Sequence, residues 1–187
     1  MAPKATIPGD GASSGRADLR PLAPSLLITP DFPPQGGGIS NYLFNVYRQF
    51  DLRQTTLIAP RHPNADTFDS GQAYSTARFE ALTSIPGLRG AWQIFQMHNR
   101  AARYLKRNRA LVVHCGHVNA AMAARALKWR YGARYVVWTH ALEIMDKRLQ
   151  RAIVPALRAA DLVIANSDFT RRFIEAAGVE PDRIAKI

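Results

Sequence analysis

Runs of consecutive apolar residues recur along the chain, and most of them stop at a polar residue. The clearest run covers residues 135–139 (Tyr-Val-Val-Trp-Thr), with basic residues before it and His140 directly after it. β-branched and aromatic residues without polar alternation are typical of a parallel strand that is covered on both faces. Further strands are predicted at residues 25–29, 54–60, 77–81, 110–114, 161–165 and 183–187.

Between these strands, apolar residues recur at helical spacing. Helices are predicted at residues 39–50, 91–109, 118–129, 149–160 and 169–177, and a polar loop at 61–71. Gly38 offers helix-start chemistry to the first helix, and Asn166 and Ser167 cap the last one. Pro155 limits or bends the fourth helix. Alternation of strands and helices predicts right-handed crossovers, so the expected fold class is doubly wound α/β, a parallel sheet with helices on both faces.

Ligands of such sheets bind beyond the carboxyl ends of the strands, so the residues that follow the strands are the candidate site. These residues are Gly36, Gly37, Gly38, His117, His140, Glu143, Asn166 and Ser167. A glycine run that opens a helix lets backbone N–H groups approach an anion, and the helix dipole adds positive charge there. Phosphate is the ligand expected to bind at the three glycines. The alternative is that the glycines only make a tight turn.

Known nucleotide motifs do not fit this glycine run. Asn41 stands where the third glycine of G-x-G-x-x-G belongs, and no acidic residue follows the second strand to hold a ribose. The Walker pattern is also absent. The sequence therefore argues against nicotinamide and P-loop chemistry.

Two histidines and one cysteine lie close together at the end of the predicted strand 110–114. His114, Cys115 and His117 are too close along a strand to face one metal ion, and no second ligand pair occurs at zinc-site spacing, so no metal is expected. Cys115 lacks a placed base and is read as a small buried side chain. His140 either acts at the site or is satisfied by backbone. Glu143 either orients that imidazole, binds a substrate hydroxyl or begins a helix.

Composition favours one domain with a tail. The chain has 187 residues, 47% of them hydrophobic, and residues 1–24 are rich in Pro, Ala, Gly and Ser, which predicts a disordered tail before a domain at 25–187. A single cysteine excludes a disulfide framework and favours a reducing compartment. No apolar run is long enough to span a bilayer, and the tail lacks the apolar core of a secretory signal. A cytoplasmic location is expected.

The formal charge of +11 is concentrated in one stretch. Residues 81–142 contain ten Lys and Arg and no acidic residue. This window is either a solvated basic face or a surface for anionic partners such as phosphorylated sugars, acidic lipid or nucleic acid. Within it, Trp92 and Phe95 of the basic helix are either core residues or anchors at a membrane interface.

Four stretches together carry a family resemblance. They are residues 33–42 (PPQGGGISNY), 112–117 (VVHCGH), 136–143 (VVWTHALE) and 159–170 (AADLVIANSDFT). Their order and spacing are similar to those in the N-terminal domain of GT-B glycosyltransferases of the retaining family 4. The resemblance covers residues 25–187.

The resemblance implies a transferase of two Rossmann-like domains, in which the N-terminal one holds the acceptor and the C-terminal one a nucleotide-diphosphate sugar, with no cofactor. Gly37 and Gly38 match the loop that approaches the donor diphosphate, and His140 matches the histidine that contacts the transferred sugar. His117 and Ser167 fall in neighbouring loops. Ala141 departs from the glycine common after the histidine. Such an enzyme uses no protein nucleophile and stabilises the departing diphosphate electrostatically.

The chain ends before the basic pair and the Glu-x7-Glu region that grip the donor in the C-terminal half of such enzymes. The expectation is therefore an N-terminal half that is inactive alone. Its expected partners are a nucleotide sugar, a glycan or lipid-linked acceptor and, peripherally, an acidic membrane at the inner face. The alternative is a non-catalytic basic module that binds nucleic acid or an acidic membrane surface. Nucleic acid is disfavoured, because no RNA-binding sheet motif or helix-turn-helix signal is present.

Overall fold

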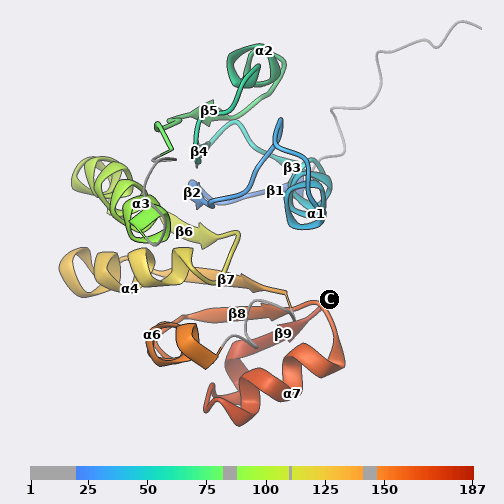
Figure 1. Ribbon diagram of the computed structural model, residues 1–187, viewed down its shortest axis with the longest axis vertical. Coiled ribbons are helices and arrows are strands. Elements are labelled where there is room, and N and C mark those ends of the chain that lie inside the picture. Colours follow the sequence, from blue (N-terminus) through green and yellow to red (C-terminus); the bar gives the residue numbers. More distant parts are fainter. Residues whose placement is uncertain (1–19, 82–87, 110, 141–146) are drawn as a thin grey trace, which may run out of the picture.

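A parallel sheet of seven strands forms the centre of the molecule in a computed structural model that describes residues 20–81, 88–109, 111–140 and 147–187. The order across the sheet is β5-β4-β2-β6-β7-β8-β9 (Figure 1). The strands are β2 (Ser25–Ile28), β4 (Thr55–Ile58), β5 (Ser75–Thr76), β6 (Val112–Cys115), β7 (Tyr135–Thr139), β8 (Leu162–Ala165) and β9 (Ile184–Lys186). Every neighbouring pair is parallel, as the alternation of strands and helices predicts.

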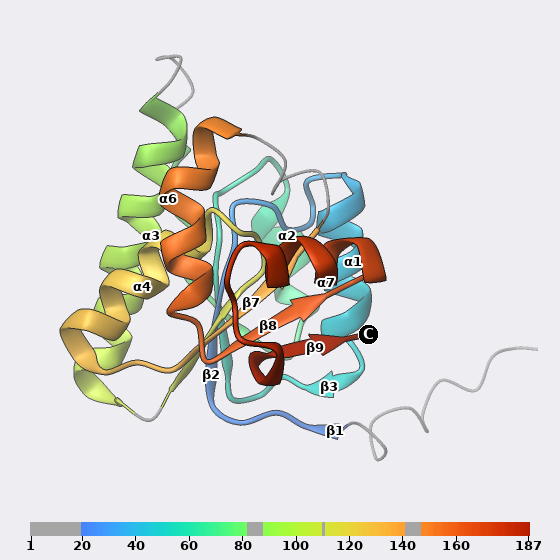
Figure 2. The same cartoon turned by 90° about the horizontal axis from the view of Figure 1, so that it is seen from below.

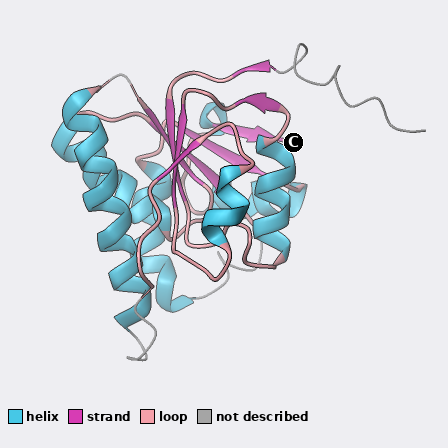
Figure 3. Ribbon diagram, turned by 90° about the horizontal axis from the view of Figure 1, so that it is seen from above, coloured by secondary structure: helices cyan, strands magenta, loops and turns pink. Residues whose placement is uncertain are grey.

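Helices cover both faces of this sheet (Figures 2 and 3). The helices are α1 (Gly38–Tyr47), α2 (Ala65–Ser70), α3 (Leu88–Arg107), α4 (Ala120–Tyr131), α6 (Lys147–Arg158) and α7 (Asp168–Ala176), with a 3-10 turn η1 (Pro181–Arg183) before β9. Helices α3, α4 and α6 lie side by side on one face, and α1 and α7 lie on the other (Figure 2). The doubly wound α/β class is confirmed.

Two apolar cores result, one on each face of the sheet. Under α3, α4 and α6, the core includes Leu105, Leu127 and Tyr135. The opposite core includes Leu43 of α1 and Trp138. Strand β7 contributes to both, which explains why residues 135–139 carry no polar alternation.

Several elements differ from the sequence predictions. Helix α2 forms inside the predicted loop 61–71. It has only six residues and buries only Ala65, so the sequence shows no helical periodicity of apolar residues there. The strand expected at 77–81 forms earlier, as β5, and only an isolated bridge between Pro60 and Phe79 continues it. Strand β1 (Arg20–Pro21) pairs with β3 (Phe50–Asp51), so the described chain begins before the domain boundary expected at residue 25. Residues 1–19 of the expected tail lie outside the described residues.

The basic helix α3 buries other side chains than Phe95. Met97, Ala101 and Leu105 of α3 are buried, whereas the side chain of Phe95 is 53% exposed. Trp92 is half-buried, and its indole N–H donates to the carbonyl oxygen of Glu80 at 3.1 Å. Phe95 is therefore not a core residue.

Candidate functional site

The order of the strands places a topological switch point between β2 and β6, where a crevice is expected. These strands are neighbours in the sheet, but β4 and β5 extend it on one side and β7, β8 and β9 on the other. The chain leaves β2 for α1 and β6 for α4, which lie on opposite faces (Figure 2). Such a switch point is the usual ligand position in this class of sheet. The loops after β2, β6, β7 and β8 are adjacent along this edge.

The glycine loop (Gly36, Gly37 and Gly38) joins the crevice to the start of α1. Gly37 has φ 155° and ψ 156°, a backbone region that is essentially restricted to glycine. Its carbonyl oxygen accepts from Asn41 N at 3.0 Å, and Ser40 Oγ donates to Gln35 O at 2.7 Å, which fixes the loop on the first turn of the helix.

Open space lies in front of all three glycines. A Cβ placed on any of them would meet no atom within 4 Å. A cavity of about 220 Å³ is lined by this loop together with Asp31, Ile39 and Ser40. Backbone N–H groups at a helix start can hold an anion there. Asp31, which sequence reasoning missed, can accept a hydrogen bond from a hydroxyl group in the same cavity.

The loop after β6 packs tightly on the other side of the crevice. A Cβ on Gly116 would lie 2.6 Å from Leu43 Cδ1 and 3.0 Å from Thr29 Cβ. Gly116 N also donates to Ile28 O at 3.0 Å. Only glycine lets this loop approach α1 so closely, and this second glycine requirement was not recognised in the sequence.

His140 contacts the helix that the glycine loop opens. Its half-buried ring meets the ring of Tyr42 edge-on, with centroids 5.2 Å apart and an interplanar angle of 87°. Tyr42 lies in α1, four residues after Gly38, so the end of β7 and the glycine loop meet through one aromatic contact. Burial raises the pKa of Tyr42, so its hydroxyl stays protonated at neutral pH. Sequence reasoning missed Tyr42, which belongs to an ordinary helical pattern.

The polar residues after β6 and β8 make helix-start contacts. His117 Nδ1 accepts from Asn119 N at 3.1 Å just before α4. Ser167 Oγ accepts from Thr170 N at 3.2 Å and caps α7, as predicted, and Asn166 Oδ1 accepts from Thr170 Oγ1 at 3.0 Å. These contacts give Asn166 and Ser167 a structural role, so a part in substrate binding stays a prediction. Glu143 and Ala141 lie outside the described residues.

His114 and Cys115 lie within β6 and do not line the cavity at the glycine loop. His114 lies inside β6, within the predicted strand 110–114, and its Nδ1 lies 2.8 Å from the hydroxyl of Tyr47. Burial lowers the pKa of His114 to about 4, so the ring is neutral, and burial raises the pKa of Cys115, which disfavours the thiolate. Among the described residues, no group of three or more His, Cys, Asp or Glu side chains is placed to hold a metal ion.

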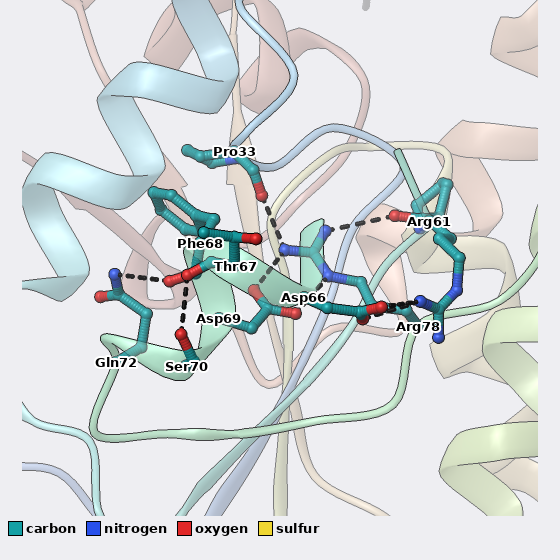
Figure 4. Close-up of polar contacts among 10 residues, drawn as sticks. Pro33, Arg61, Asp66, Thr67, Phe68, Asp69, Ser70, Gln72 and Arg78 are labelled. Atoms are coloured by element: carbon teal, nitrogen blue, oxygen red, sulfur yellow. Dashed lines mark hydrogen bonds and ion pairs between the residues drawn. The ribbon is translucent and has the colours of Figure 1, made fainter. Parts of the chain in front are cut away.

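A buried ion pair between Arg78 and Asp69 holds the segment that leads into the glycine loop (Figure 4). Arg78, which follows β5, donates from Nε and Nη2 to the Asp69 carboxylate of α2 at 3.0 and 2.7 Å. Its Nη2 also donates to Pro33 O at 2.6 Å, and its Nη1 donates to Pro60 O at 3.2 Å. The two charged side chains are only 2% and 8% exposed. One guanidinium therefore ties together the loops after β2 and β4 and the helix α2.

The parallel sheet, its switch point and the glycine loop at a helix start define a Rossmann-like α/β domain with its crevice at the carboxyl ends of the strands. The chain belongs to glycosyltransferase family 4, because the model of that family matches residues 36–187. The resemblance noted in the sequence is thereby confirmed. No curated protein sequence matches the chain.

Solved structures with the same fold include a protein crystallised with a nucleotide. Anabaena Alr3699/HepE in complex with UDP and glucose is 16% identical with a TM-score of 0.64, over 88% of this chain and 44% of that chain. Sucrose-phosphate synthase from Thermosynechococcus elongatus is 14% identical with a TM-score of 0.61, over 90% of this chain and 47% of that one. UDP-N-acetylglucosamine 2-epimerase from Rickettsia bellii is 14% identical with a TM-score of 0.58, over 90% and 44%. This chain thus spans less than half the length of each.

Proposed function

We propose that this chain is the N-terminal half of a retaining glycosyltransferase, which moves a sugar from a nucleotide-diphosphate sugar to a glycan or lipid-linked acceptor and needs a C-terminal half for activity. Membership in family 4 supports sugar transfer. The observation that carries the proposal is the contact of His140 with Tyr42 of α1, beside the open glycine loop. Complexes of HepE with UDP and with UDP-glucose support a nucleotide sugar as donor.

In the proposed reaction, the bond between the anomeric carbon and the donor phosphate breaks, and the acceptor oxygen bonds to that carbon on the same face. The acceptor proton passes to the departing diphosphate. Amide groups of Gly37 and Gly38 and the dipole of α1 stabilise the charge that develops on the diphosphate. His140 contacts the transferred sugar. His117, Glu143, Asn166 and Ser167 are proposed to border the acceptor.

A lipid-linked acceptor places the reaction at a membrane, and we propose peripheral contact at the cytoplasmic face. No helix within the described part of the chain is long and apolar enough to cross a bilayer. Cys115 is a free thiol, which agrees with a reducing compartment.

Turnover assays test the proposal. The purified 187-residue chain is incubated with radiolabelled nucleotide sugars and with glycan or lipid-linked acceptors, and no transfer is expected. A protein extended by the coding sequence downstream of residue 187 should transfer, and His140→Ala should lower its kcat by about 10²- to 10³-fold. His98→Gln on α3, assayed with a soluble glycan acceptor, is the matched control, because His98 lies outside the glycine loop and the strand ends.

Each component of the proposal has its own contrary result. Transfer by the 187-residue chain alone would show that no C-terminal half is needed. Full activity of the extended His140→Ala variant would remove the role of His140. Epimerisation of UDP-N-acetylglucosamine without an acceptor would favour the chemistry named in the Rickettsia bellii structure over sugar transfer.

A further inference from the structure

Helix α4 is apolar on its outer side as well as on its core side. Ala120, Ala124 and Leu127 are buried against the sheet. Met122 and Trp129 lie on the opposite side at helical spacing, and Trp129 is 87% exposed. Arg125 lies beside them on the same side and is also exposed, so the outer side of α4 combines exposed apolar surface with positive charge.

Apolar depressions flank this outer side. One, of about 400 Å³, lies between α3 and α4 and is lined in part by Phe95, Met122 and Ala126. The other, of about 500 Å³, is lined by Met122, Ala126, Trp129 and Ala159 with two basic side chains. Because both depressions include Met122 and Ala126, they form one continuous apolar strip across α4. The helices α3, α4 and α6 that border it make up one outer layer of the molecule (Figure 2).

The strip is surrounded by positive charge. Helices α3 and α4 contain no acidic residue. Their exposed basic side chains are Arg89, Arg103, Lys106, Arg107, Arg125 and Arg130. Lys128 does not add to this field, because its ammonium group lies 2.8 Å from Asp161 Oδ1. The α3–α4 surface is defined here as Phe95, Met122, Arg125, Ala126 and Trp129 with this basic surround.

We infer that the α3–α4 surface docks on an acidic lipid bilayer. An exposed indole beside apolar depressions suits the boundary between headgroups and acyl chains, where tryptophan is enriched. The basic surround matches anionic headgroups. A second copy of the chain fits poorly, because it would set two like-charged surfaces against each other. Nucleic acid would use the charge but would leave the apolar depressions beside Met122 without an occupant.

The inference does not depend on glycosyl transfer, because lipid binding is measured without donor or acceptor. The 187-residue chain is sedimented with vesicles of phosphatidylcholine alone or mixed with phosphatidylglycerol. Binding is expected only to the acidic vesicles and should weaken as salt is raised. Trp129→Ala and Arg125→Glu should each weaken binding by about tenfold. Trp129 is almost fully exposed, so its loss removes little packing from the fold.

Control variants lie on the opposite face of the sheet. Phe169 of α7 is 51% exposed, nearly the same as Phe95, and Arg172 of α7 is exposed like Arg125. Phe169→Ala and Arg172→Glu should bind acidic vesicles as the unmodified chain does. Tryptophan emission should shift to the blue on binding, and Trp129→Phe should reduce that shift, since Trp138 is buried and only Trp92, which packs on Phe95, remains near the surface.

Three results would overturn the inference. Equal binding to acidic and neutral vesicles would remove the electrostatic component. Unchanged binding of Trp129→Ala, or equal losses for the α7 controls, would place the contact elsewhere. Failure to bind any vesicle, together with Trp129-dependent binding of single-stranded DNA or of an acidic protein, would assign the surface to that partner instead.

Discussion

Arg78 Nη2 donates to Pro33 O across 2.6 Å, so a residue that follows β5 holds the segment that leads into the glycine loop. The same nitrogen lies 2.7 Å from Asp69 Oδ1. The segment that leads into the glycine loop and helix α2 therefore share one buried cation. Arg78 acts through other residues, as a positioning residue for the proposed site.

Loss of this cation should destabilise the fold strongly. Arg78→Met leaves the Asp69 carboxylate buried without its partner and leaves Pro33 O without its donor. The free energy of unfolding should fall by about 3–5 kcal/mol, measured by urea denaturation. Arg53→Met is the matched control, because the Arg53 side chain is 79% exposed in its pair with Asp51. That variant should change stability little.

A double variant separates charge burial from packing. Arg78→Met with Asp69→Leu removes both charges, so it should recover part of the loss caused by Arg78→Met alone. If Arg78→Met were as mild as Arg53→Met, the buried pair would not hold the loop.

The backbone of Gly37 predicts a difference between adjacent glycines. Gly37→Ala forces a Cβ onto φ 155° and should lower the free energy of unfolding by about 1–3 kcal/mol. Gly36→Ala is the control, because that position has no such φ and no atom within 4 Å of its Cβ. Thermal or urea unfolding of both variants tests the difference. Equal effects would mean that the conformation of Gly37 is not required.

At Gly116 the limit on substitution comes from close packing and not from the backbone conformation. Gly116→Ala places a methyl group 2.6 Å from Leu43 Cδ1 and should lower the free energy of unfolding by about 1–3 kcal/mol. Leu43→Val in the same chain should relieve part of the clash. Gly90→Ala in α3, where a Cβ meets nothing within 4 Å, should instead stabilise by about 0.5–1 kcal/mol. A neutral Gly116→Ala would contradict the tight approach of the β6 loop to α1.

Acid should destabilise the fold through His114. Its pKa is about 4 in the folded chain and about 6.5 when unfolded, so between these values the unfolded state binds the extra proton. The free energy of unfolding should therefore be flat above pH 6.5 and fall by about 3 kcal/mol as the pH drops to 4.

His114→Gln isolates this contribution. Denaturant titrations across the pH range should show a shallower acid loss for the variant, whatever its stability at pH 7. Burial also lowers the pKa of His62, which supplies a residual slope of the same sign. An unchanged slope in His114→Gln would show that His114 is not held neutral by burial.

The positions of most strands along the chain could be predicted, because the apolar residues of a buried parallel strand are visible in the sequence itself. The run at 135–139 and the polar residues at its end need no tertiary information, and neither does the helix cap at Ser167. The predicted strand 110–114 ends one residue before β6 does, because Cys115 stands between His114 and Gly116 and looks like part of the following loop. The ring of His114 is half-buried, and its Nδ1 lies 2.8 Å from the hydroxyl of Tyr47, which is far away in the chain.

Other parts of the site depend on contacts that leave no local pattern. Arg78 reads as one more surface arginine until Asp69 and the two proline carbonyl oxygens surround it. Gly116 reads as a loop residue until Leu43 approaches. The apolar outer side of α4 was also missed, because an alanine-rich helix gives a weak period and Trp129 passes for a core residue.

The position of β2 between β4 and β6 affects how the chain folds during its synthesis. Ser25 pairs with Thr55 on one side and with Val112 on the other. During synthesis, β2 and β4 can associate early, but the other edge of β2 stays open until the ribosome has released β6. The glycine loop and α1 therefore emerge long before Gly116 can reach them. Slowing translation between β4 and β6 should prolong the time for which a nascent chain is bound by chaperones.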